Sequence, residues 1–178
     1  MIVAVLAGGR GRRMGGAKAT ALLRGEPLIA RPLAAARAAG LDAVVVAKPD
    51  TELPELDVPV WTEPDLPVHP LRGLVTALEH GPLIAVACDQ PWVTADVLRA
   101  LAAHDGPALA VADEPFPGRY EPAQLPVLRD ALVREASLRS TLARLRPPAL
   151  GADAVLVASV NTPDALAAAE RSLGCGAP

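Results

Sequence analysis

The sequence predicts an α/β protein, a three-layer α/β/α sandwich around a mostly parallel sheet. Short apolar runs alternate along the chain with longer, alanine-rich stretches of helical period, the order expected for parallel strands joined by helical crossovers. Hydrophobic residues make up 51% of the chain and aromatic residues only 2%. The core must therefore be built from Ala, Val and Leu. The 178 residues suit a sizeable core, and we expect one domain over residues 1–178.

The first element is the apolar run Ile2–Leu6, whose lack of polar alternation predicts a buried parallel strand. Similar runs predict strands at Ala43–Lys48, Leu83–Cys88, Ala108–Ala112 and Ala154–Val160, with a short strand at Val58–Trp61. Helical periodicity predicts helices over Leu28–Ala39, Leu71–His80, Ala95–His104, Arg129–Glu135, Leu138–Leu145 and Pro163–Ser172. Ligands of open α/β sheets bind outside the carboxyl ends of the strands. Polar residues that follow these strands are therefore candidate site residues.

A glycine-rich, basic stretch from Leu6 to Lys18 directly follows the first predicted strand. It holds five glycines and four cationic side chains. Glycines let backbone N–H groups close on an anion, and Arg and Lys supply charge that a phosphate can use. The stretch is not a P-loop, because Ala19 follows the lysine where a hydroxyl is needed. It is not a dinucleotide fingerprint either, because Met14 replaces the third glycine. The concentration of charge suggests a triphosphate.

The pattern Leu6-Ala7-Gly8-Gly9 followed by Arg13 and Lys18 resembles the signature of the molybdenum cofactor guanylyltransferases, the MobA-like nucleotidyltransferases. The resemblance implies a Rossmann-like nucleotidyltransferase fold. It also implies Mg²⁺-dependent transfer of GMP from GTP to the phosphate of molybdopterin, with release of pyrophosphate. The implied GTP-binding residues are Leu6, Ala7, Gly8, Gly9, Arg13, Lys18, Glu63 and Asp89. Arg13, Lys18 and Asp89 are the implied catalytic residues.

Two polar residues at predicted strand ends fit a metal site. Asp89 follows a wholly apolar strand and precedes a proline turn. Such an aspartate can ligate Mg²⁺, which prefers carboxylate and phosphate oxygens, or can merely close a turn. Asn161 precedes Thr162 and Pro163, which suit the N-cap and first position of a helix. Capping does not require the asparagine, and the resemblance implies that Asn161 and Asp89 hold the metal.

The acidic, proline-rich stretch between Trp61 and Gly73 contains the Pro-Leu-x-Gly segment of the family. The resemblance implies an acidic residue here that helps to hold the nucleotide. Glu63 aligns best with it and Asp65 is the competitor, while a simple acidic surface loop is the alternative interpretation. The chain departs from the family pattern at several positions, among them Ala17, His69 and Ser159 in place of the usual Asp, Gly and Asn.

The expected mechanism needs no protein nucleophile, because the acceptor phosphate brings an ionised oxygen that attacks the α-phosphorus. Lys18 and Arg13 would offset the charge on the leaving pyrophosphate. The alternatives are a related nucleotidyltransferase that uses CTP or another phosphorylated acceptor, and a non-catalytic nucleotide-binding homologue. Gly8 favours the guanylyl branch, since the cytidylyl branch usually has alanine there.

Composition excludes several other classes of protein. The net charge of −3 argues against general nucleic-acid binding. Cys88 and Cys175 have no metal-binding spacing and predict no disulfide framework, and Cys88 is most simply a small buried hydrophobe. No apolar run reaches membrane-spanning length, and Met1 leads directly into the first strand. We therefore expect a cytoplasmic protein that binds neither nucleic acid nor membrane. The resemblance implies that its partners are GTP and molybdopterin, and we expect a monomer or weak homo-oligomer.

Overall fold

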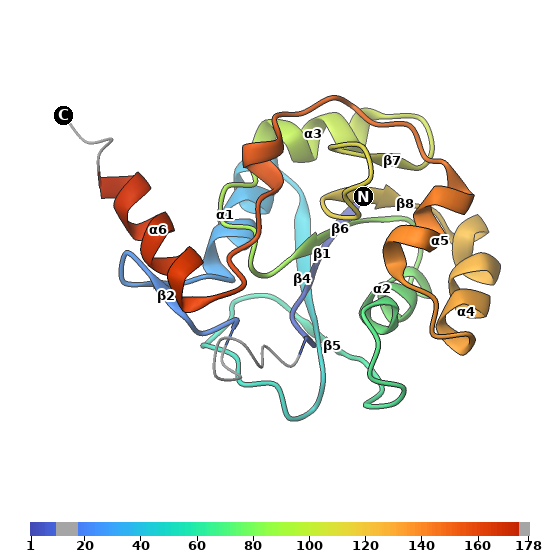
Figure 1. Ribbon diagram of the computed structural model, residues 1–178, viewed down its shortest axis with the longest axis horizontal. Helices are drawn as coiled ribbons and strands as arrows, with labels where there is room; N and C mark the ends of the chain where they lie inside the picture. The colour runs from blue at the N-terminus through green and yellow to red at the C-terminus, as the bar shows by residue number, and fades with distance from the viewer. Residues whose placement is uncertain (10–17, 175–178) are drawn as a thin grey trace.

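The computed structural model, described over residues 1–9 and 18–174, is organised around a six-stranded sheet of order β5–β4–β1–β6–β8–β7 (Figure 1). The strands are β1 (Ile2–Leu6), β4 (Asp42–Ala47), β5 (Val60–Thr62), β6 (Leu83–Ala87), β7 (Ala108–Leu109) and β8 (Gly118–Tyr120). The first four run parallel, and β8 runs antiparallel to both β6 and β7. The prediction of a mostly parallel sheet is confirmed.

Helices cover both faces of the sheet, as a three-layer sandwich requires. One face carries α1 (Ala30–Ala39) and α3 (Ala95–Ala103), and the other carries α2 (Leu71–Leu78), α4 (Leu125–Val133) and α5 (Leu138–Leu145) (Figure 1). Alternate strand residues face opposite layers, so that Val3 and Val5 pack beneath α1 and α3 while Ala4 packs beneath α2. Each central strand is therefore apolar on both sides, which explains its continuous hydrophobic run.

The last helix, α6 (Pro163–Gly174), packs on a small hairpin outside the main sheet. The hairpin consists of β2 (Leu22–Leu23) and β3 (Glu26–Pro27), which the sequence analysis did not predict. Arg24 and Gly25 form its two-residue turn with φ of 57° and 81°. Leu23 and Ala169 belong to the apolar cluster that joins hairpin and helix.

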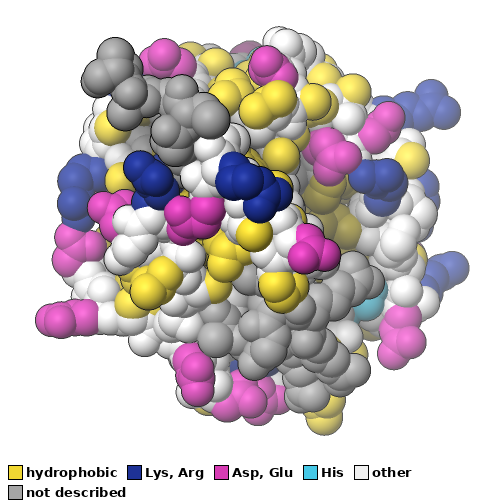
Figure 2. Space-filling model, turned by 60° about the vertical axis from the view of Figure 1, so that its left-hand side comes forward, with side chains coloured by type: hydrophobic (Ala, Val, Ile, Leu, Met, Phe, Trp, Pro, Cys, Tyr) yellow, Lys and Arg dark blue, Asp and Glu magenta, His cyan; other side chains and the backbone are white. Residues whose placement is uncertain are grey.

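The surface mixes charges of both signs. Figure 2, which turns the left-hand side of Figure 1 forward, shows acidic and basic side chains interspersed over this face rather than gathered by sign. Among the described residues, no helix has both the length and the hydrophobicity needed to cross a membrane.

The strand predicted at Ala154–Val160 is wrong, because the chain forms a 3₁₀ helix, η3, over Ala154–Val157. Within this turn Val157 is buried, whereas Ala154 and Val155 are exposed, so the residues do not alternate as those of a half-buried strand would. The Asp153 carboxylate accepts from Val155 N at 2.9 Å and starts the turn.

Two other predicted boundaries differ from the structure by more than two residues. Strand β7 ends at Leu109 rather than at Ala112. Helix α4 begins at Leu125, four residues before the predicted start, because Pro126 is tolerated in the first turn of a helix.

Gln90 ties three segments together just after β6. Its side chain is 3% exposed; Oε1 accepts from Ala87 N at 3.1 Å, and Nε2 donates to the carbonyls of Phe116 and Val157, both at 2.7 Å. We predict that Gln90→Leu lowers the free energy of unfolding by about 2–4 kcal/mol, because several buried polar groups lose their partners at once. Urea denaturation followed by circular dichroism measures this change.

The control is Arg129→Met, which removes a half-exposed ion pair with Glu79. Exposed ion pairs contribute little to stability, so the free energy of unfolding of this variant should stay within about 0.5 kcal/mol of the wild-type value. A Gln90→Leu protein as stable as the control would show that the three buried hydrogen bonds add no net stability.

Candidate functional site

A cavity of about 330 Å³ lies at the carboxyl edge of the parallel strands. Each of the four parallel strands delivers a residue to it: Gly8 and Gly9 follow β1, Lys48 follows β4, Glu63 follows β5 and Asp89 follows β6. The strands end level with one another, because Leu6 pairs in register with both Val46 and Ala87. The position of the cavity agrees with the rule for open α/β sheets.

Lys18 and Asp89 line one end of the cavity, and Asn161 lies beside them. The Lys18 ammonium forms an ion pair with Asp89 Oδ2 and donates to Asn161 Oδ1 at 2.5 Å. The Asp89 carbonyl accepts from Val160 N at 2.8 Å, which holds the segment before α6 beside the end of β6. Thr162 caps the helix as predicted, because its hydroxyl accepts from Ala165 N at 3.1 Å. The structure thus brings together three of the predicted site residues.

The donor set at this end suits a hard divalent cation. Asp89 and Asn161 turn one oxygen each toward a single positive atom, the Lys18 nitrogen. Mg²⁺ is bound by one or two carboxylates and completes its shell with phosphate oxygens and water. Among the described residues no group of three or more His, Cys, Asp or Glu could hold a metal. An ion here would therefore depend on oxygens from a bound ligand.

Cys88 lies in the cavity wall next to Asp89 but is not equipped as a nucleophile. Burial, and then the neighbouring carboxylate, raise the pKa of the Cys88 thiol to about 12. The thiol therefore stays protonated at neutral pH, and the reactive thiolate is absent. The prediction that Cys88 is a buried apolar residue is confirmed.

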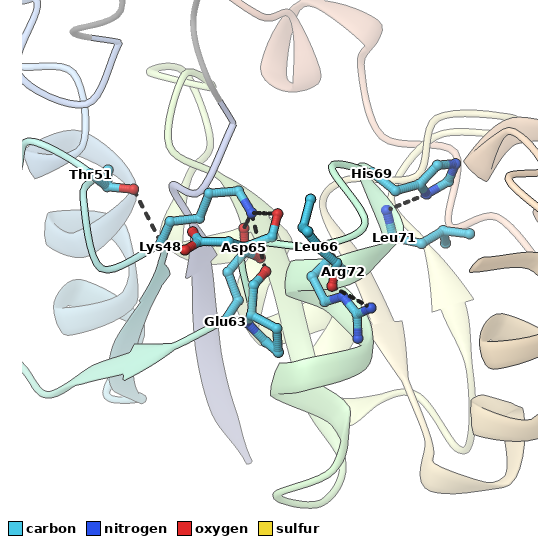
Figure 3. Close-up of polar contacts among 9 residues, drawn as sticks. Lys48, Thr51, Glu63, Asp65, Leu66, His69, Leu71 and Arg72 are labelled. Atoms are coloured by element: carbon cyan, nitrogen blue, oxygen red, sulfur yellow. Dashed lines mark hydrogen bonds and ion pairs between the residues drawn. The ribbon is translucent and has the colours of Figure 1, made fainter. Parts of the chain in front are cut away.

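The other end of the cavity holds a buried ion pair between Lys48 and Glu63. Ala47 and Thr62 are partners in the parallel register of β4 and β5, so the residues that follow them lie side by side. Lys48 Nζ is 3.5 Å from Glu63 Oε1, and both side chains are 5% exposed (Figure 3). Burial raises the pKa of the Glu63 carboxyl, and the nearby Lys48 charge opposes that rise.

Glycines on two neighbouring segments make room for the Glu63 carboxylate. A Cβ at Gly8 would lie 1.9 Å from Glu63 Oε1, and one at Gly73 would lie 2.6 Å from Oε2. Both distances are shorter than any real contact, so the carboxylate occupies space that only glycine leaves free. Of the two predicted candidates, Glu63 lines the cavity, whereas the Asp65 side chain is exposed.

The remaining predicted site residues differ in where they lie relative to the cavity. Leu6, Gly8 and Gly9 line the cavity. Ala7 is buried, and its N–H donates to the Val46 carbonyl at 2.8 Å. Arg13 lies outside the described residues. The part of each of these residues in binding GTP stays a prediction.

Sequence reasoning missed Lys48, although a signal was present. Of the 17 Lys and Arg residues in the chain, only Lys18 and Lys48 are lysines. Both line this cavity. A chain that otherwise uses arginine for its positive charges thus places a compact ammonium at each end of one site.

Comparison with known proteins identifies relatives of this chain. The family model of the MobA-like NTP transferase domain matches residues 3–146. A molybdenum cofactor guanylyltransferase from Rhodobacter capsulatus is 35% identical over 98% of this chain and 97% of its own length. Another from Pseudomonas putida (strain GB-1) is 32% identical over 92% and 94%, respectively.

Solved structures share the fold. Molybdopterin-guanine dinucleotide biosynthesis protein A from Archaeoglobus fulgidus superposes with a TM-score of 0.77 at 24% identity, covering 98% of this chain and 100% of that one. The 2-C-methyl-D-erythritol 4-phosphate cytidylyltransferase from Thermus thermophilus gives 0.69 at 19% identity, covering 98% of each chain. The predicted nucleotidyltransferase fold is confirmed, and the chain belongs to the MobA-like NTP transferase family of nucleotidyltransferases.

Proposed function

We propose that this protein is a molybdenum cofactor guanylyltransferase, which transfers GMP from GTP to the phosphate of molybdopterin and releases pyrophosphate. The observation that carries the proposal is the contact of Lys18 with both Asp89 and Asn161 at the end of the cavity that Lys18 and Asp89 line. The names of the full-length relatives support the choice of substrates.

The residues at this end of the cavity have two roles, one in binding the metal ion and one in binding the phosphates of GTP. Asp89 and Asn161 would hold Mg²⁺, which would supply positive charge to neutralise the phosphates and polarise the α-phosphoryl group. Lys18 exchanges its present partners for phosphate oxygens of GTP. There it stabilises the charge that develops on pyrophosphate as the bond between the α-phosphorus and the bridging oxygen breaks. Arg13 acts on the same phosphates.

The attacking group comes from the acceptor. An ionised phosphate oxygen of molybdopterin forms the new bond to the α-phosphorus, so the enzyme needs to orient two substrates rather than supply a nucleophile. The protonated Cys88 thiol beside Asp89 agrees with that expectation.

The end of the cavity that holds Lys48 and Glu63 suits guanine better than cytosine as the bound base. Guanine presents the adjacent donors N1–H and N2–H, and the Glu63 carboxylate offers two acceptor oxygens. Cytosine presents an amino group beside an unprotonated ring nitrogen, which a carboxylate repels. We predict that GTP with Mg²⁺ raises the melting temperature by roughly 5–10 °C at ~100 times its Kd. CTP and UTP at the same concentration should raise it clearly less in a thermal-shift assay. A larger shift with CTP would rule out the guanylyl assignment.

The metal role of Asp89 predicts a loss of turnover without a loss of fold. Asp89→Asn keeps the shape of the side chain and removes its charge. We expect pyrophosphate release from GTP and molybdopterin to slow by at least about 100-fold, because changes to outer-shell residues alone cost 10–100-fold. Coupled pyrophosphate detection measures the rate, and circular dichroism checks the fold.

Two results would contradict this assignment. An Asp89→Asn enzyme with wild-type turnover would remove Asp89 from the metal site. A wild-type protein that binds GTP but releases no pyrophosphate with molybdopterin would instead indicate a non-catalytic homologue.

A further inference from the structure

Lys48 is a buried cation whose three N–H groups all have partners. Its Nζ donates to the carbonyls of Pro64 at 3.1 Å and Asp65 at 3.0 Å and faces Glu63 Oε1 at 3.5 Å (Figure 3). An ammonium has three donors and no acceptor, so its bonding capacity is filled. A buried charge is costly unless it is paired. We therefore infer that the positive charge of Lys48 has a role in addition to packing.

The three partners of Lys48 are consecutive residues. One ammonium fixes the side chain of Glu63 and the backbone of the two residues that follow it. The main-chain N–H of Lys48 donates to Thr51 Oγ1 at 3.1 Å, which ties down the start of the next loop (Figure 3). The planar guanidinium of an arginine could not serve three acceptors arranged around one point. This explains a lysine in a chain dominated by arginine.

The carboxylate that Lys48 holds packs closely against the backbone of Gly8 and Gly73. Its oxygens lie where side chains at Gly8 and Gly73 would be. It lines the cavity between the end of β1 and the start of α2. Its oxygens therefore meet a ligand as a fixed pair of acceptors rather than as an adaptable side chain.

We propose that Lys48 is a positioning residue for base selection, which fixes Glu63 as a two-oxygen acceptor and so makes the site prefer guanine to bases with fewer N–H donors. This inference rests on the proposed function and deepens it. Guanine offers N1–H and N2–H together, whereas hypoxanthine offers only N1–H. Loss of one hydrogen bond to a charged acceptor should weaken binding by roughly 10–100-fold.

The charges around Glu63 make this preference depend on pH. Among the described residues, those that face it are Lys48 after β4, Arg72 on α2 and Asp65 on its own segment, while β1 brings the uncharged Gly8. Burial raises the pKa of Glu63, and Lys48 is the strongest influence that lowers it. Two N–H donors need the ionised carboxylate. The preference is therefore present above the Glu63 pKa and lost as the pH falls through it.

The test compares the Kd of GTP with that of ITP, the hypoxanthine nucleotide, by calorimetry with Mg²⁺ between about pH 5.5 and 8.5. We expect the wild type to favour GTP by roughly 10–100-fold at neutral pH. In Lys48→Met the pKa of Glu63 rises further, so the pH at which the ratio falls toward one should be higher than in the wild type. A side chain with a purely structural role would not produce that shift of the pH profile.

Lys18→Met is the matched control, because it removes the other lysine of the same cavity. It should weaken GTP and ITP by similar factors and leave their ratio unchanged, since both nucleotides carry the same triphosphate. Glu63→Gln should abolish the preference at every pH. Adding Lys48→Met to that variant should not change the ratio further.

The outcomes separate the two proposals. A Lys48→Met protein that retains the wild-type ratio at all pH values would overturn the role of Lys48. Equal weakening of both nucleotides in that variant would do the same. A wild type that binds no nucleotide would overturn the proposed function and, with it, this inference. If Lys48→Met does not fold, the wild-type pH profile and Glu63→Gln decide: a ratio independent of pH, or unchanged in Glu63→Gln, overturns the proposal.

Discussion

The parallel register of four strands is the constraint on which the site depends. Because β1, β4, β5 and β6 are paired so that they end level, the residues just beyond them meet in one cavity although they are far apart in the sequence. The strands hold that register because alternate residues are buried in two separate apolar layers. A slip by one residue would exchange the layers. The same slip would also separate Lys48 from Glu63.

The two lysines show how similar ion pairs can serve different purposes. Buried pairs contribute little net stability, because desolvation opposes their attraction, so their presence at a cavity points to function. The Lys18 side chain is 19% exposed and holds partners from two segments, which leaves it able to change partners when an anion enters. Lys48 is 5% exposed and fully bonded, which suits it to hold a neighbour in place.

Most of the fold could be predicted from the sequence, and the failures have physical causes. Asp89 was identified because a wholly apolar strand ends in one carboxylate. The choice of Asn161 comes from the family resemblance and does not depend on the strand predicted before it, which is absent. Strand β8 and the hairpin β2–β3 were missed because segments of two or three residues carry no detectable period. The sequence predicts Lys48 only as the last residue of a strand. Its contact with Glu63 depends on the register of β4 and β5, which the sequence pattern does not specify.

Under the proposed function, Gly8 links the glycine-rich stretch after β1 to the choice of base. The sequence resemblance associates this glycine with the guanylyl branch, and the structure supplies a steric reason for an association of that kind. A methyl group at position 8 would overlap the Glu63 carboxylate, so alanine there and a glutamate held in this place exclude each other. A chain with alanine at this position must shorten, turn or lose its acidic side chain, and with it the acceptor that suits N1–H and N2–H. Under the proposed function, the glycine at position 8 and the preference for guanine both follow from the close contact between Gly8 and Glu63.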